Sequence, residues 1–241
     1  MTTSLAELLA ETLGQALTLC TRRLVTRSGF RTRGFHNSRR FGRLPWESAI
    51  ERQMLERLDH SWLTARLEAQ AITLRIPSVA DARGFFLYTP DAITLDRHDR
   101  LFVLEAKSFQ DLQSEEIQSK HRDIRMCLRA CGVGYIEVSE RDMGLAALQA
   151  NLEQLYRAGR VMPLTRQKDR AVTLIDRHKP AVYAALDELL GACGALHALA
   201  HGLLTFNVHQ ALDASTALVT QPNEDIDAAL FIYSRSSASA V

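Results

Sequence analysis

The feature that most restricts the fold is the run LFVLEAK at residues 101–107. Its first four residues are all apolar, which is typical of a strand buried in the middle of a sheet. Side chains alternate along a strand, so Glu105 and Lys107 share one face while Ala106 points to the other. This strand must therefore carry a carboxylate and an ammonium group together at its end. Such charges are costly to bury without partners, so the pattern indicates a functional site.

A second carboxylate precedes this strand. Asp91 follows Pro90 in the run FFLYTPDAITL, which we interpret as a strand interrupted at the proline, with His98 and Asp99 in the turn that leads to the next strand. Two converging carboxylates suit a hard divalent cation, which takes oxygen ligands and keeps waters for a phosphate substrate. A neighbouring lysine can orient or help deprotonate the attacking water and offset negative charge. The pattern, PD-(D/E)xK, thus predicts metal-assisted phosphodiester hydrolysis.

The same residues have a simpler interpretation, because a salt bridge between Glu105 and a nearby base would also place an acid and a lysine on one strand. Three observations favour a site. The strand before Lys107 is apolar, so its charges stand out. The helix predicted over 46–59 supplies Glu51 and, one turn earlier, Glu47. Gln70 lies just before a strand, where its polar group could reach the site.

The remaining periodicity predicts a mixed α/β fold with a short central sheet flanked by helices. Further helices are expected over 4–20, 114–131 and 145–157, and further strands over 65–76 and VGYIEVS. The segment 157–171 is polar and basic and is interpreted as a linker or interdomain loop. Beyond it we expect helices over 180–191, 194–204 and 207–213, with STALVT as a terminal strand or wing. The apolar face of the 114–131 helix is expected to carry Ile117, Ile124, Met126 and Leu128.

One basic segment has no acidic residue. Between Glu11 and Glu47 the chain contains eight arginines, and we expect the part over 21–45 to be extended or loosely ordered. A solvated arm is one interpretation. DNA phosphates are the alternative that we favour, because the guanidinium fork matches phosphate oxygens and counterion release drives such binding. The expected DNA-binding residues are Arg22, Arg23, Arg27, Arg31, Arg33, Arg39, Arg40 and Arg43.

Three other features exclude classes of protein. The four cysteines form no CxxC pair, which fits a reducing compartment. No secretory signal and no run of about 18 apolar residues is present, so we expect a cytoplasmic protein without a membrane partner. His197 and His201 lie one helical turn apart, but HALAH lacks the glutamate of a zinc hydrolase helix, and we expect no metal there.

The stretch from Arg39 to about Arg141 resembles the catalytic domain of TnsA, the endonuclease subunit of heteromeric transposases. The pieces that carry the resemblance are SRRFGRLPWESAIERQML, EAQAI, YTPDAITL, LFVLEAK and GVGYIEVSERDM. In that family an "ER" glutamate opens the site, "TPD" supplies the aspartate and an (E/Q)xK strand completes it. The chain has AQA where the family often has EQP. The resemblance implies a restriction-endonuclease-like fold and the catalytic set Glu51, Asp91, Glu105 and Lys107, with Glu47 and Gln70 as accessory residues.

The resemblance also implies a metal ion, partners and a domain plan. Mg²⁺ or Mn²⁺ would be held by Asp91, Glu105 and Glu51. The substrate would be double-stranded DNA at transposon ends, cut in one strand to leave a 5′ phosphate and a 3′ hydroxyl. The partners would be a DDE-type transposase (TnsB-like) and an AAA+ regulator (TnsC-like). The expected segments are an N-terminal helix and arginine-rich arm at 1–45, a nuclease domain at 46–158, a helical, winged-helix-like domain at 168–225 and a tail at 226–241.

Two other functions stay open on the sequence. The chain could be a stand-alone restriction, repair or defence nuclease with the same core. It could also be a catalytically silent DNA-binding or assembly subunit. The C-terminal region could likewise be a generic helical cap on the core instead of a winged helix.

Overall fold

The structure is a computed structural model that describes residues 3–14, 33–61, 63–143, 146–160 and 165–219. These residues form two compact units. The first contains the described residues of 3–59 and 63–143, and the second contains 60–61 and the described residues from 146 to 219. In chain order, the first unit consists of α1 (Leu5–Thr12), β1 (Gly34–Ser38), β2 (Gly42–Trp46), α2 (Ala49–His60), β3 (Thr64–Ala69), β4 (Leu74–Pro77), β5 (Phe85–Tyr88), β6 (Ala92–Asp96), β7 (Leu101–Ala106), α3 (Phe109–Leu112), α4 (Glu115–Ala130) and β8 (Gly134–Val138).

The main sheet of this unit has four strands in the order β3-β6-β7-β8. Strands β3, β6 and β7 pair antiparallel, and β8 pairs parallel to β7. A parallel neighbour requires a crossover connection, and α4 provides it. Every residue of β7 is buried, because strands lie on both of its sides. The predicted mixed α/β fold with a central apolar strand is therefore confirmed.

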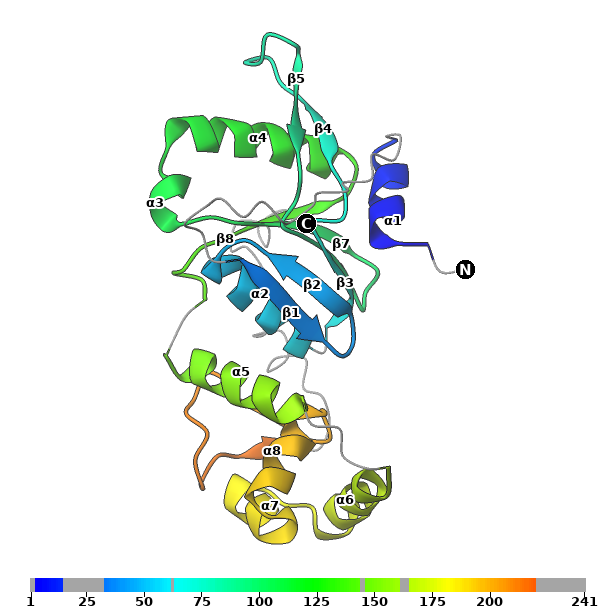
Figure 1. The fold of residues 1–241 in the computed structure, drawn as a ribbon, viewed down its shortest axis with the longest axis vertical. Helices are drawn as coiled ribbons and strands as arrows, with labels where there is room; N and C mark the ends of the chain where they lie inside the picture. Colours follow the sequence, from blue (N-terminus) through cyan, green and yellow to red (C-terminus); the bar gives the residue numbers. More distant parts are fainter. Residues whose placement is uncertain (1–2, 15–32, 62, 144–145, 161–164, 220–241) are drawn as a thin grey trace. The chain divides into compact units, whose positions relative to one another are not determined.

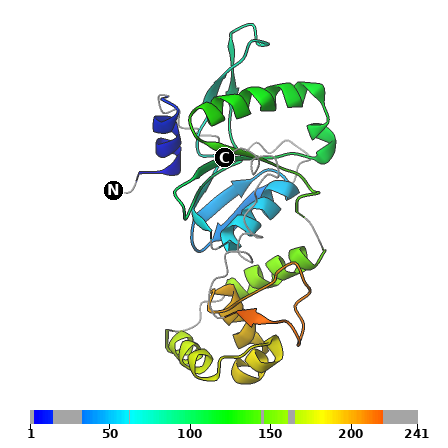
Figure 2. The same ribbon diagram turned by 180° about the vertical axis from the view of Figure 1, so that it is seen from behind.

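Helices cover both faces of the sheet. Figure 1 and Figure 2 show α4 along one side of the sheet and α2 on the other. The face toward α4 forms a core in which Ile93 and Val103 of the sheet cluster with Ile124 and Leu128 of α4. Leu9 of α1 joins the same core. On α2, the predicted apolar stripe is buried at Met54, Leu55 and Leu58.

The first helix is attached to the sheet at its N-terminus. Ser4 and Glu7 form a capping box at its start. The Glu68 carboxylate on β3 also accepts the backbone N–H groups of Leu5 (2.8 Å) and Ala6 (3.1 Å). The first amides of a helix have no partner within the helix and favour negative charge, so Glu68 stabilises α1 on the sheet. The described helix ends at Thr12, and the rest of the expected 4–20 helix lies outside the described residues.

The arginine-rich segment is more ordered than we expected. Residues 34–46 form the antiparallel hairpin of β1 and β2 instead of a loose arm. The two strands form because the apolar and aromatic side chains here have a surface to pack on. Leu44 is buried, and a Cβ atom on Gly34 would meet the Trp46 ring at 2.4 Å. Residues 15–32 lie outside the described part.

The strand expected over 65–76 is two strands in different sheets. It breaks at Gln70, whose φ of 49° lies in the left-handed region. After this break, β4 pairs with β5 in a separate hairpin, which extends from the main sheet in Figure 1. The apolar alternation changes phase at this break, because the buried positions are Leu67 and Ala69 before it and Ile72, Leu74 and Ile76 after it. One continuous strand could not bury both sets on the same face, so this change of phase is the local signal of the break. On α4, Met126 was wrongly assigned to the apolar face, because it is 61% exposed.

The second unit is mostly helical and ends in a short hairpin of β9 and β10 that pair antiparallel. Its core brings α5 together with α8, so α5, expected in the nuclease domain, belongs to this unit. The expected linker 157–171 is helical from Thr165, and no helix forms over 207–213. The elements are α5 (Ala146–Gly159), α6 (Thr165–His178), α7 (Tyr183–Leu190), α8 (Ala192–Ala200), β9 (Thr205–Phe206) and β10 (Leu218–Val219).

A close contact at the start of β8 predicts a stability change. A Cβ atom on Gly134 would lie 2.3 Å from the Phe102 ring on β7, so a larger residue must displace the ring or the strand. We expect Gly134→Ala to lower the free energy of unfolding by about 1–3 kcal/mol in thermal or urea unfolding. Gly159→Ala is the matched control, because its Cβ would lie 3.7 Å from that of Ala200, an ordinary contact. Equal stability of Gly134→Ala and the parent would contradict the expectation.

Candidate active site

The predicted acidic residues meet where β6 begins and β7 ends. Ala92 and Leu104 are partners in the antiparallel register of these strands, so Asp91 comes opposite Glu105 at the sheet end. An Asp91 carboxylate oxygen accepts the backbone N–H of Ala106 at 2.8 Å. This hydrogen bond fixes Asp91 against the last residues of β7. The antiparallel pairing of β6 with β7 is therefore what brings Asp91 and Glu105 together.

Glu105 and Lys107 form an ion pair, with 3.0 Å between the lysine Nζ and Glu105 Oε1. Glu105 is buried, while the lysine side chain is 38% exposed. The Lys107 backbone N–H donates to the Val138 carbonyl, which continues the β7–β8 pairing past the end of the strand. Burial disfavours the charged lysine, but the carboxylates of Glu105, Asp91 and Glu51 outweigh it and raise the pKa of Lys107.

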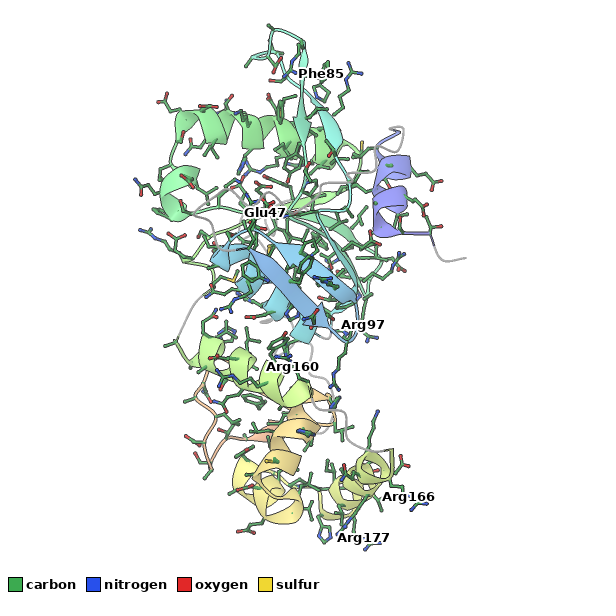
Figure 3. The ribbon with its side chains drawn as sticks, in the orientation of Figure 1. Glu47, Phe85, Arg97, Arg160, Arg166 and Arg177 are labelled. Carbon is green, nitrogen blue, oxygen red and sulfur yellow. The ribbon has the colours of Figure 1, made fainter. Side chains whose placement is uncertain are left out.

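Glu51 reaches the same region from the first turn of α2 and also caps that helix. Its backbone N–H donates to Ser48 Oγ (3.1 Å), and its Oε2 accepts the backbone N–H of Glu47 (2.8 Å). This closely resembles the reciprocal bonding of a capping box. Burial raises the pKa of Glu51, although the bonds to Glu47 and Ser48 oppose the shift. Glu47 contributes its amide and a repulsive charge to this site (Figure 3).

Gln70 links these groups. Its side-chain amide donates to Glu51 Oε2 at 3.3 Å, and its backbone N–H donates to the Asp91 carbonyl at 3.2 Å. The left-handed backbone at Gln70 is what ends β3 and lets both contacts form. The four expected catalytic residues and the accessory Gln70 are thus brought into one region of the first unit.

Sequence reasoning missed the role of two buried tyrosines. The Tyr88 hydroxyl lies beside the Glu105 carboxylate and the Tyr135 hydroxyl. Burial, reinforced by the charge of Glu105, raises the pKa of both tyrosines. Among the described residues, neither hydroxyl has a hydrogen bond of ordinary geometry, and neither does Glu105 Oε2. Tyr135 follows only from the register of β8, in which it pairs with Val103.

The charges of this region favour a cation. Burial and repulsion from Glu105 and Glu51 raise the pKa of Asp91 well above its usual range. Glu105 Oε2 and Gln70 Oε1 are buried oxygens without a hydrogen-bond donor within the described part of the chain. Carboxylate and amide oxygens are the ligands that Mg²⁺ accepts, so the residue types fit a hard divalent cation.

The carboxylates do not form a ready-made cage. In the described ranges, no three His, Cys, Asp or Glu side chains are arranged to hold a metal ion. One physical reason is that Glu51 accepts the amide of Glu47 and the side chain of Gln70. Asp91 and Glu105 remain as the pair best placed to bind. Magnesium commonly uses one or two carboxylates and completes its shell with water and substrate oxygens.

The structure divides the predicted DNA-binding arginines into three groups. Arg40 donates to the carbonyl oxygens of Asp59 and Thr64, and burial lowers its pKa, so this guanidinium holds the hairpin to the fold. Arg43 is exposed and stacks on the Phe35 ring at 3.5 Å. Arg33 and Arg39 are also exposed. The other four, Arg22, Arg23, Arg27 and Arg31, lie outside the described residues.

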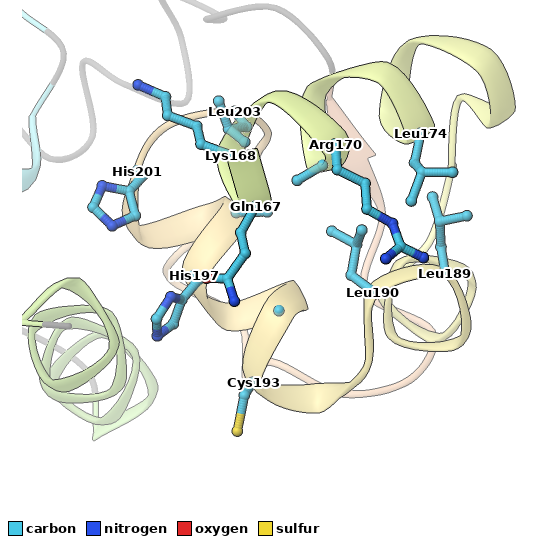
Figure 4. Close-up of a pocket in the computed structure, with 13 residues that line it drawn as sticks. Gln167, Lys168, Arg170, Leu174, Leu189, Leu190, Cys193, His197, His201 and Leu203 are labelled. Atoms are coloured by element: carbon cyan, nitrogen blue, oxygen red, sulfur yellow. The ribbon is translucent and has the colours of Figure 1, made fainter. Parts of the chain in front are cut away.

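The second unit has a cavity of about 420 Å³ between α6 and α8, with α7 at one side (Figure 4). Lys168 and Arg170 of α6 line it together with His197 and His201 of α8. The two imidazole rings meet edge to face with their centres 6.1 Å apart. Within the described ranges no third ligand completes a metal site with them.

The sequence matches no model of a known protein family, and it has no significant match among curated proteins. The resemblance to TnsA therefore depends on the motifs quoted above. In the part of the chain that the structure covers, no helix has the length and apolar character needed to cross a membrane.

The raised pKa of Asp91 predicts a gain of stability when its charge is removed. Asp91→Asn keeps an oxygen for the Ala106 amide and relieves repulsion from Glu105 and Glu51. In metal-free buffer at pH 7 we expect its thermal midpoint to exceed that of the parent by a few degrees. The gap should shrink as the pH falls through the raised pKa toward the ordinary value, because the parent carboxyl then becomes protonated in the folded state.

The exposed Asp111 provides the control for this measurement. Asp111→Asn should leave the midpoint at pH 7 nearly unchanged. A lower midpoint for Asp91→Asn than for the parent at pH 7 would show that the carboxylate stabilises the metal-free fold.

Proposed function

We propose that this chain is a metal-dependent DNA endonuclease with a restriction-endonuclease-like core. The observation that carries the proposal is the convergence of Asp91, Glu105 and Lys107 where β6 begins and the buried strand β7 ends. A structural salt bridge alone would account for Glu105 and Lys107. A salt bridge does not explain why a third charged residue, Asp91, lies here. Burial and repulsion from Glu105 and Glu51 raise its pKa, so its charged form is unfavourable in the metal-free protein.

The order of the elements supports this core. Strands β3, β6 and β7 form an antiparallel meander, α4 crosses over, and β8 returns parallel to β7. The acidic residues lie at one end of the two central strands. That arrangement agrees with the expectation from the motif, in which the aspartate precedes one strand of a hairpin and the ExK residues end the next.

The residues of the chain have separable roles in the proposed reaction. A divalent cation held by Asp91 and Glu105 would polarise the phosphodiester and lower the pKa of a bound water. Lys107 has a raised pKa and is therefore protonated at neutral pH in the metal-free site. Lys107 would orient the attacking water and offset negative charge on the phosphate. Gln70 and the cap of α2 hold Glu51 beside this group.

The proposed substrate is double-stranded DNA. Each unit carries exposed, positively charged side chains that can bind its phosphate groups. On the β1–β2 hairpin these are Arg39 and Arg43. On α6, cationic residues outnumber the acidic Asp169 and Asp176. Figure 3 shows the Arg166 and Arg177 side chains on this helix. The cations of α6 are Arg166, Lys168, Arg170 and Arg177.

The resemblance to TnsA extends the proposal to transposon ends. In that setting the chain would cut one strand beside a DDE-type transposase and an AAA+ regulator, leaving a 5′ phosphate and a 3′ hydroxyl. The second unit supports the winged-helix-like part of this proposal, because α6, α7 and α8 are followed by the β9–β10 hairpin in the position of a wing.

The direct test is strand cleavage in Mg²⁺ or Mn²⁺. The full chain would be incubated with end-containing DNA and the partner transposase, and nicking would be measured on a gel with end analysis. We expect Asp91→Ala and Lys107→Ala each to reduce cleavage by roughly 100-fold or more, because each removes a group that acts on the reacting phosphate. Lys120→Ala, at an exposed lysine of α4, should cut like the parent. Cleavage by the Asp91 and Lys107 variants at the parental rate would refute the assignment.

The tyrosines predict a graded change in metal affinity. Tyr88 borders Glu105 directly, and Tyr135 is one contact further away. We expect Tyr88→Phe to weaken Mn²⁺ binding about tenfold in calorimetry, since groups around a ligand orient it, and Tyr135→Phe to weaken it less. Neither change should destabilise the metal-free fold much, because neither hydroxyl has a hydrogen bond of ordinary geometry to another described residue, and Tyr88 lies beside Glu105 only in a looser contact. Parental Mn²⁺ affinity in Tyr88→Phe would show that its hydroxyl does not support Glu105.

A further inference from the structure

The first unit has a pocket next to the candidate active site. It is a pocket of about 390 Å³ between α3, the first half of α4 and β8. Phe109, which lines the pocket, follows Lys107 by two residues in the chain. Glu137 closes it from β8, where this residue is the register partner of Glu105 on β7. The pocket is lined by Phe109, Leu112, Gln113, Gln118, His121, Arg122, Arg125 and Glu137.

The charges of the pocket are not balanced. Glu137 is neutralised within the protein, because its Oε1 lies 2.5 Å from Arg125 Nη2 and 3.1 Å from His121 Nδ1. His121 is buried, so this part of the pocket is formed by a packed side chain of the fold and not by an exposed surface residue. Arg122 is exposed and forms no salt bridge with another described residue. The pocket therefore keeps one cation for a ligand, with the Gln113 and Gln118 side chains beside it. Gln118 Nε2 donates to the Leu112 carbonyl at 3.1 Å, which leaves its second N–H and its amide oxygen for a ligand.

One wall is aromatic and held in place. The Arg141 guanidinium lies 3.3 Å from the centre of the Phe109 ring, and the Phe109 backbone N–H donates to the Glu140 carboxylate at 2.8 Å. Ser108 accepts the Asp111 amide and starts α3 at this point. A fixed ring beside a cation and amide donors suits a planar base joined to a phosphate, because bases stack on aromatic rings whatever their sequence.

We propose that this pocket binds a single nucleotide of the DNA strand next to the phosphodiester that is cut. The phosphate meets Arg122, and the base lies against Phe109 between Gln113 and Gln118. A volume of about 390 Å³ is in the range of small-ligand pockets and too small for a duplex, so the nucleotide enters unpaired. The place of the pocket in the reaction rests on the proposed nuclease function, whereas binding of the nucleotide does not.

The test is titration of the full chain with thymidine 5′-monophosphate in EDTA, so that metal and catalysis play no part. Calorimetry or side-chain amide shifts of Gln113 and Gln118 report binding, with inorganic phosphate and thymidine as separate probes. We expect the mononucleotide to bind at least fivefold more tightly than either probe. Arg122→Gln and Phe109→Leu should each weaken it about tenfold, which corresponds to the loss of one charged contact or one stacked base.

Arg129→Gln is the matched control, because Arg129 is also exposed on α4 but does not line the pocket. It should bind the mononucleotide like the parent. Phosphate binding as tight as the mononucleotide, absence of binding, or equal affinity in Arg122→Gln and the parent would each overturn the inference.

Cleavage kinetics distinguish this proposal from the nuclease itself. If the chain is the proposed nuclease, Arg122→Gln should raise the KM for DNA several-fold with little change in kcat. An unchanged KM in a variant that has lost mononucleotide binding would overturn the place of the pocket in the reaction. Mononucleotide binding by a chain that does not cleave would support the pocket while the nuclease proposal fails.

Discussion

The burial of β7 is the constraint on which the rest of the first unit depends. All six of its residues are buried, so β6 and β8 must cover its edges and helices its faces. Apolar residues allow this along most of the strand, but Glu105 near its end is also buried. A buried carboxylate needs a partner, and Lys107 supplies one charge. Asp91 then adds a second carboxylate that the lysine alone cannot balance.

This excess of negative charge connects stability with the proposed activity. In the metal-free protein, burial and mutual repulsion raise the pKa of Asp91 and Glu51. Hydrogen bonds from the amides of Ala106 and Glu47 hold both carboxylates in place in spite of this cost. A divalent cation would reverse the sign of the interaction, because carboxylates that repel each other would then share one ligand. The same residues would thus be unfavourable for the isolated fold and favourable for binding, as is common at functional sites.

The two pockets differ in what they offer a ligand. The pocket beside β8 has a fixed aromatic wall, and its only carboxylate is already paired with Arg125 and His121. The cavity of the second unit is lined by basic and apolar side chains from α6, α7 and α8. The first adjoins strands that carry the candidate catalytic residues, which is why a nucleotide there has a stated place in the reaction. The second cavity lies in the other unit, which contains none of the candidate catalytic residues.

The sequence by itself determined the central strand, the helices that flank it and the candidate residues Asp91, Glu105 and Lys107. These follow from local apolar patterns and from the period of two along one strand. Tertiary structure decided what depends on pairing between distant segments. The hairpin over 34–46 and the transfer of α5 to the second unit leave the local periodicity unchanged. At Gln70 the apolar alternation changes phase, but the pairing of β4 with β5 in a separate sheet is decided by tertiary contacts. Likewise, Tyr135 comes beside Glu105 through the register of β8 against β7, and Tyr88 comes there from the β4–β5 hairpin. The nucleotide-sized pocket forms only where α3 and α4 pack beside β8, which no single segment encodes.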